Sequence, residues 1–309
     1  MRGTIERGCS PIWAVVSLTF QAMILRVAVI LKSVLALIAV LAPLAIGALV
    51  VRLVESGFAF YPLAGETVTP ERFGIAHEAL SVATSDGEQL RGWALPAQGP
   101  AEGGHDVQVI ARAHIVYFHG NGGNLSIWAP ILAGIARQGY SVLAFDYRGY
   151  GRSTGSPNER GLYRDVDAVV KRFWDGPRQD VPVVYWGRSL GGTMAAYAAT
   201  VRAPDGLILE SAFPDVRSLV RSQPLLALLA LFSTYRFPAA EFLQHVKSPV
   251  LVMHGDNDGV IPFGQGHALF ERIAGPKRFV TILGGDHNDL TPPDPRVYWE
   301  AVDEFIVGL

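Results

Sequence analysis

The feature that most constrains the fold is a sharp turn at Gly187-Arg188-Ser189-Leu190-Gly191. The apolar run before it, residues 183–186, is typical of a buried strand, and the small and apolar residues from 193 onward indicate a buried helix. So abrupt a turn strains the backbone at the serine, and Gly187 and Gly191 leave room where a Cβ would clash. The sequence therefore predicts that Ser189 is presented at a sheet edge, above a helix N-terminus that favours developing negative charge.

Predicted strands and helices alternate along the rest of the chain. An edge hairpin is expected over residues 79–84 and 90–97, followed by a Gly-rich polar loop over 98–106. Further strands are expected at 110–118, 140–145, 181–186, 206–210, 250–253 and 279–283, and helices up to 138, at 159–174 and at 297–309. This alternation predicts an α/β fold with a mostly parallel central sheet and helices on both faces. Such a sheet brings together the residues at its strand ends, here His119, Asp146, Ser189, Glu210, Asp258 and His287.

A serine nucleophile needs a base, and the base needs a carboxylate that orients it. His287 is the candidate base because it follows the last predicted strand. Asp256 and Asp258 both follow the preceding strand, and either could orient the imidazole. His119 and His254 each precede a glycine at a strand end, where histidines more often shape a loop by hydrogen bonding.

An oxyanion hole requires two backbone N–H donors. Leu190, directly after the serine, is one candidate, and Asn121 or otherwise Gly122 of the Gly-rich loop is the other. A Gly-rich loop before a helix could instead hold phosphate, but neither nucleotide-binding glycine motif occurs there.

An uncharged apolar stretch near the N-terminus predicts a transmembrane anchor over residues 33–52. A cleaved signal peptide is the alternative. Residues 1–32 are expected to form a separate N-terminal segment. Its uncharged run, residues 10–25, is an interfacial helix, a second marginal span or a stretch upstream of a true start at Met23. Arg26 and Lys32 precede the span, which favours an inside N-terminus and a catalytic domain on the outer face. The aromatic residues within 58–62 are expected at headgroup level.

Composition argues against several other classes of protein. The formal net charge of −2 gives no basic footprint for nucleic acid. The single cysteine, Cys9, excludes an intrachain disulfide, and no Cys/His cluster has metal-ligand spacing. We expect no cofactor and no metal.

Six motifs in order resemble the membrane-anchored, Bem46-like serine hydrolases of the α/β-hydrolase superfamily. They are H-G-N-x-x-N at 119–124, D-Y-R-G-Y-G-x-S at 146–153, G-x-S-L-G-G at 187–192, L-E-S-x-F at 209–213, H-G-x-x-D-x-x-x-P at 254–262 and G-x-x-H-N-D at 284–289. The resemblance spans residues 58–309. It implies the α/β-hydrolase fold, a catalytic triad of Ser189, Asp258 and His287, and hydrolysis of esters or thioesters without a cofactor.

Residues 214–245 are expected to form a small cap, and the apolar run at 225–232 is either a helix packed on the sheet or the lining of an acyl pocket. Two alternatives to an esterase stay open. One is a catalytically silent binding module at the membrane, against which the complete triad argues. The other is a peptidase of the same fold.

Overall fold

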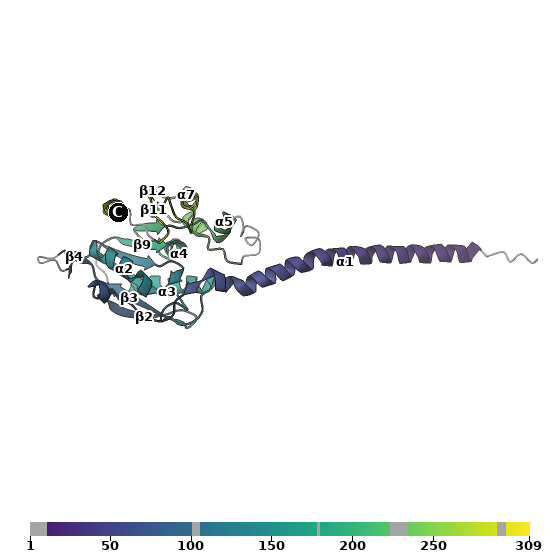
Figure 1. Cartoon of the computed structure of the whole chain (residues 1–309), viewed down its shortest axis with the longest axis horizontal. Helices are drawn as coiled ribbons and strands as arrows, with labels where there is room; N and C mark the ends of the chain where they lie inside the picture. The colour runs from purple at the N-terminus through teal and green to yellow at the C-terminus, as the bar shows by residue number, and fades with distance from the viewer. Residues whose placement is uncertain (1–10, 101–105, 178–179, 223–233, 289–294) are drawn as a thin grey trace, which may run out of the picture. The chain divides into compact units, whose positions relative to one another are not determined.

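The computed structural model describes residues 11–100, 106–177, 180–222, 234–288 and 295–309. The chain divides into two compact units, Met1–Leu53 and Val54–Leu309. The first unit is a helical segment, and the second contains the sheet and the helices that cover it (Figure 1).

Helix α1, Pro11–Ala59, is continuous and contains the predicted span of 33–52. Within it, Thr19–Leu53 contains an 18-residue window with a mean hydropathy of 2.9, and among the described residues it is the one helical stretch long and apolar enough to cross a membrane. The sequence left residues 10–25 as a separate interfacial helix or second span. From Pro11 onward they belong instead to the same helix, because no helix-breaking residue separates them from the apolar run.

The central sheet of the second unit has eight strands in the order β12-β11-β10-β9-β6-β8-β3-β2. The hairpin of β2 and β3 forms one edge and pairs antiparallel with β8, and all other neighbours are parallel, as predicted. The strand bounds are β2 Glu78–Ala83, β3 Gln89–Leu95, β6 Ala113–Phe118, β8 Tyr140–Phe145, β9 Val183–Arg188, β10 Gly206–Glu210, β11 Val250–Gly255 and β12 Lys277–Ile282.

Helices cover both faces of this sheet, which confirms the predicted layers. Strand β9 alternates between two hydrophobic cores, with Tyr185 in one and Trp186 in the other. The Tyr185 core contains residues of α3 (Glu159–Asp175), α4 (Leu190–Val201), α6 (Ala239–Leu243) and α7 (Phe263–Glu271). The Trp186 core contains residues of α2 (Leu125–Arg137) and α8 (Pro295–Val307).

Two short strand pairs lie outside the central sheet. Strands β4 (Gln98–Pro100) and β5 (Asp106–Gln108) pair antiparallel, so the Gly-rich stretch predicted as a polar loop is bounded by a small ladder. Strand β1 (Tyr61–Pro62) pairs in parallel with β7 (Gly122–Gly123), which brings residues just after α1 beside the loop that follows β6. A short 3-10 helix, η1 (Pro70–Phe73), follows β1.

The predicted headgroup position of the aromatic residues at 58–62 is wrong for Phe60. Its side chain is 4% exposed and lies in the Tyr185 core. Its ring meets those of Tyr235 and Phe237 edge-on, at centroid distances of 5.3 and 6.1 Å. Burial among aromatic rings removes more apolar surface from water than an interfacial position would.

Only part of the predicted cap is described. Helix α5 (Val216–Arg221) precedes residues 223–233, which are not described, and helix α6 follows them. The apolar run at 225–232 lies outside the described residues, so its role as cap or core helix stays a prediction.

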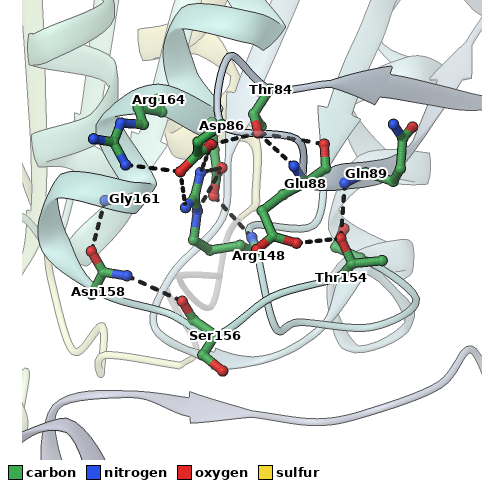
Figure 2. A network of polar contacts seen from close by, with 12 residues as sticks. Thr84, Asp86, Glu88, Gln89, Arg148, Thr154, Ser156, Asn158, Gly161 and Arg164 are labelled. Atoms are coloured by element: carbon green, nitrogen blue, oxygen red, sulfur yellow. Dashed lines mark hydrogen bonds and ion pairs between the residues drawn. The ribbon is translucent and has the colours of Figure 1, made fainter.

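The D-Y-R-G-Y-G-x-S motif joins the edge hairpin to α3 through a buried guanidinium. Arg148 is 4% exposed, and its Nη1 lies 2.8 Å from Asp86 Oδ2 in the hairpin turn. Its Nε donates to Asp165 Oδ1 of α3 at 2.9 Å. Figure 2 shows Arg148 and the half-exposed Arg164 both meeting Asp86. Because buried charges need partners, Arg148 stabilises the loop after β8 by joining it to the hairpin turn and to α3.

Replacing Arg148 by methionine leaves Asp165 as an unpaired buried carboxylate. We expect Arg148→Met to lower the free energy of unfolding by about 3–5 kcal/mol. The matched change Arg164→Met removes an exposed partner of the same Asp86 and should cost less than about 1 kcal/mol. Urea unfolding of the full chain in detergent micelles measures both, and equal losses would contradict this account.

Candidate active site

The turn between β9 and α4 holds Ser189 in a strained conformation. Its φ is 55° and its ψ is −120°, a region that side-chain-bearing residues rarely adopt. A Cβ at Gly187 would lie 2.1 Å from the Gly191 carbonyl oxygen, and one at Gly191 would lie 1.9 Å from the Phe118 carbonyl oxygen. The predicted need for glycine at both positions is therefore confirmed.

The strained serine is fixed by its neighbours rather than by its own preference. Its N–H donates to the Glu210 carbonyl at the end of β10 at 2.8 Å, and its own carbonyl accepts from the Gly192 N–H at 2.9 Å. Helix α4 begins at Leu190, whose N–H is one of the four at a helix start that have no partner one turn back. Ser189 is 8% exposed, so the residue is buried but not fully shielded from solvent.

The last two loops of the sheet bring a histidine and a carboxylate together. His287 Nδ1 lies 2.8 Å from Asp258 Oδ2, and both side chains are buried. Asp258 Oδ1 accepts the N–H groups of Val260 and Ile261 at 2.9 and 2.7 Å. His254 Nε2 donates to the Ile261 carbonyl at 2.9 Å, so this histidine shapes the loop as predicted.

These contacts decide the charge on Asp258. Burial works against ionisation, but the hydrogen bonds from His254, His287 and Ile261 outweigh it and hold the pKa of Asp258 well below its usual value. Asp258 is therefore a carboxylate beside the imidazole. Asp256, the alternative left open by the sequence, accepts the Gly284 N–H at 2.6 Å instead.

Sequence reasoning missed the part played by Arg188. Its Nη2 donates to the carbonyl of His287 at 2.6 Å, and its guanidinium lies 5.6 Å from the Trp128 ring centroid. The nearby Glu210 carboxylate raises the pKa of Arg188 although burial opposes it. The elbow and the histidine loop are thus tied together directly. The sequence signal that could have revealed this contact is a charged residue, Arg188, at the end of an apolar strand, because a buried charge needs a partner.

Arg188, the residue before Ser189 in the turn, donates a hydrogen bond to the His287 carbonyl. In the described part of the chain, no direct hydrogen bond joins the side chains of Ser189 and His287. In enzymes, a hydrogen bond between nucleophile and base often tightens only when substrate is bound. No group of three or more His, Cys, Asp or Glu side chains suited to a metal occurs among the described residues.

The loop after β6 also lies beside the elbow. A Cβ at Gly120 would lie 3.5 Å from the Arg188 carbonyl oxygen, which places the loop against the turn. Asn121 is half-buried, and its side-chain amide donates to the Ala59 carbonyl at 2.7 Å. Gly122 is exposed and faces open space. The donor roles of the Leu190, Asn121 and Gly122 N–H groups stay predictions.

Comparison with known proteins gives consistent relatives. A family model described as Hydrolase_4, serine aminopeptidase S33, matches residues 110–243. Uncharacterized protein Rv2307c of Mycobacterium tuberculosis is 32% identical over 255 residues, which are 80% of this chain and 85% of that protein. Uncharacterized membrane protein YNL320W of Saccharomyces cerevisiae is 30% identical over 247 residues, 77% of this chain and 82% of that protein.

One further relative and one solved structure of similar fold carry a functional name. Lysophosphatidylserine lipase ABHD12 of Mus musculus is 33% identical over 208 residues, which are 60% of this chain and 52% of that protein. The esterase Pf2001 of Pyrococcus furiosus superposes with a TM-score of 0.63 at 17% identity, over 80% of this chain and 97% of that structure. At this identity the esterase shows a shared fold and no more.

The lowered pKa of Asp258 makes its contribution to stability depend on pH. A depressed carboxyl pKa stabilises the folded state above the usual value of 3.8, and this contribution is lost as pH falls through the folded-state pKa. We expect wild type to exceed Asp258→Asn in unfolding free energy by a few kcal/mol above about pH 5, with the gap narrowing below about pH 4. Urea unfolding between pH 3 and 7 measures it; a gap as large at pH 3 as at pH 7 would refute the assignment.

Proposed function

This chain belongs to the α/β-hydrolase superfamily, and from that premise we propose that it is a membrane-anchored serine hydrolase that cleaves carboxylic ester or thioester bonds of acyl-containing substrates. The observation that carries the proposal is the 2.8 Å contact between Asp258 and His287, tied by Arg188 to the strained turn at Ser189. A carboxylate, an imidazole and a serine at the strand ends are the groups that acyl transfer needs.

The first half of the reaction forms an acyl-enzyme. Ser189 Oγ attacks the substrate carbonyl while His287 Nε2 accepts the hydroxyl proton. The N–H groups of Leu190 and of Asn121 or Gly122 stabilise the resulting oxyanion. As the tetrahedral intermediate collapses, the carbon–oxygen or carbon–sulfur bond breaks and the leaving group takes the proton from His287.

The second half returns the enzyme to its starting state. Water loses a proton to His287 Nε2 and attacks the acyl-enzyme, and collapse of this intermediate releases the acid and gives the proton back to Ser189. Throughout, Asp258 accepts the Nδ1–H of His287, which keeps Nε2 available and stabilises the imidazolium.

The anchor supports an acyl-lipid substrate. The stretch Thr19–Leu53 is apolar enough to span a bilayer, and the yeast relative is described as a membrane protein. The name of the mouse relative describes it as a lipase for lysophosphatidylserine. An active site tethered beside a bilayer meets long-chain acyl groups at high local concentration.

The nucleophile assignment predicts selective covalent labelling. A fluorophosphonate probe should add once to full-length wild type and not at all to Ser189→Ala, because only a serine next to a base is reactive enough. Ester turnover in Ser189→Ala should fall by roughly 10⁴-fold or more. Intact mass measures the adduct, and Ser156→Ala, which changes an exposed serine, is the matched control. A folded wild type that takes no adduct would refute the proposed chemistry.

The substrate class is tested separately from the nucleophile. A panel of acetyl to palmitoyl esters, the matching thioesters and an aminoacyl amide, assayed in micelles, should give kcat/KM that rises with chain length. Equal turnover of short and long chains would remove the support for a lipid substrate. Preferential cleavage of the amide would favour a peptidase, the activity in the family model's description.

The proposed orientation can be tested through the single cysteine, Cys9. With the N-terminus inside, a membrane-impermeant maleimide should label Cys9 only after the cells are permeabilised. The double variant Cys9→Ser, Ile110→Cys presents a thiol on the domain at a position that is 79% exposed, and it should be labelled in intact cells. Cys9→Ser alone is the blank. The reverse pattern would invert the orientation, and labelling of both thiols in intact cells would contradict a membrane span.

A further inference from the structure

The segment that follows the apolar part of α1, residues 55–68, lies along the Gly-rich loop after β6. We call these residues the juxtamembrane segment. All of them belong to the same compact unit as the hydrolase domain, Val54–Leu309. The stretch Thr19–Leu53 ends just before the segment begins. Only a few residues of chain therefore separate the proposed anchor from Ala59, which contacts the Gly-rich loop.

Asn121 is where the segment meets the loop most directly. Its side-chain amide donates to the Ala59 carbonyl at 2.7 Å. The hydroxyl of the buried Tyr150 donates to both the side-chain oxygen and the backbone carbonyl of Asn121, at 2.9 Å each. Both ends of the Asn121 amide are thus engaged. The residue is fixed between the end of α1 on one side and Tyr150 on the other.

Further contacts continue along the loop. Tyr61 and Pro62 pair with Gly122 and Gly123, and the Leu63 N–H donates to the Gly123 carbonyl at 2.8 Å. Beyond them, Asn124 donates to the carbonyls of Leu63 and Gly65 at 3.0 and 2.8 Å, and Ser126 Oγ accepts the N–H groups of Thr67 and Val68. The segment therefore supports the loop from Asn121 into the first turn of α2.

The start of the juxtamembrane segment also contacts residues on the elbow side of the site. The Glu55 carboxylate accepts the backbone N–H of Thr234 and of Tyr235. Phe60 packs against Tyr235 and Phe237, and the Phe237 carbonyl accepts from Thr193 of α4. The same short stretch thus reaches both the Gly-rich loop and the residues that cover the helix after Ser189.

A loop of this composition needs such support. Three of its residues are glycines, and Gly123 has a φ of 85° that a side chain would disfavour. Glycine-rich backbone has many accessible conformations, so a defined position for an N–H must come from outside contacts. An oxyanion donor stabilises the transition state only when it is preorganised, and misplacement by about 1 Å can cost 10²-fold in rate.

We propose that the side chains of Asn121 and Tyr150 are positioning residues for the oxyanion hole, and that they hold the Gly-rich loop by fastening it to the juxtamembrane segment at Ala59. Catalytic competence then depends on the end of the anchor helix. This inference rests on the proposed function. It assigns to the Asn121 side chain a role separate from that of its backbone N–H, because the side-chain donor is already occupied.

Tyr150→Phe removes one hydroxyl and keeps the ring, and Asn121→Ala removes the amide while the backbone N–H remains. In the full chain in micelles, with a p-nitrophenyl ester, we expect kcat to fall by roughly 10- to 100-fold in each while KM stays within about twofold. A trifluoromethyl ketone, which forms a tetrahedral adduct, should bind weaker by a similar factor. The leaving group p-nitrophenol, which has no acyl oxygen to place in the hole, should bind unchanged.

Tyr140→Phe is the matched control. Tyr140, at the start of β8, is also fully buried, and its hydroxyl donates to Asp303 of α8. Unchanged kcat in Tyr150→Phe and in folded Asn121→Ala would overturn the inference, and so would an equal loss in Tyr140→Phe. If Asn121→Ala does not fold, Tyr150→Phe decides alone. Failure of the wild type itself to label at Ser189 would instead overturn the proposed function.

Discussion

The rest of the structure depends on how closely strand β6 and the start of α4 approach each other. At Gly191 an added Cβ would lie 1.9 Å from the Phe118 carbonyl oxygen, so the helix can sit here only because this side chain is absent. That approach brings the Gly-rich loop after β6 beside the serine turn. In the same turn Ser189 has a positive φ, a strain that its backbone hydrogen bonds to Glu210 and Gly192 hold in place.

Buried polar groups then connect the loops of the sheet edge to one another. Arg188 links the serine turn to the backbone of His287, and Asp258 links His287 to the loop after β11. In each link a charge is kept from water and a specific partner satisfies it, which makes the arrangement rigid. Arg148 does the same further away, between the hairpin turn and α3. These contacts of charged groups therefore fix the positions of the loops. The two apolar cores on either side of the sheet supply the stabilisation.

The sequence predicted features that leave a mark on residue type. Strands β8 and β10 have the predicted bounds, because apolar runs bounded by turn residues define them. The glycines of the Ser189 turn likewise indicated the close packing that the structure shows there. The groups that accept hydrogen bonds from the Arg188 and Asn121 side chains could not be predicted, since both are backbone carbonyls, which every residue carries alike. The two-residue pairing of β1 with β7 was missed for the same reason. Phe60 was misassigned because an aromatic ring suits a membrane interface and a protein core equally well.

The position of Glu55 sets a boundary for any processing of the N-terminus. Cleavage within the apolar stretch, for example near Ala45, would remove most of that stretch and leave a domain that still carries Glu55, Ala59 and β1. Cleavage after Ala59 would leave Asn121 without its carbonyl partner and the Gly-rich loop without its neighbouring strand. Loss of the apolar stretch and loss of the support at the Gly-rich loop are therefore distinct events, and the two cleavage positions that cause them lie only a short stretch of chain apart.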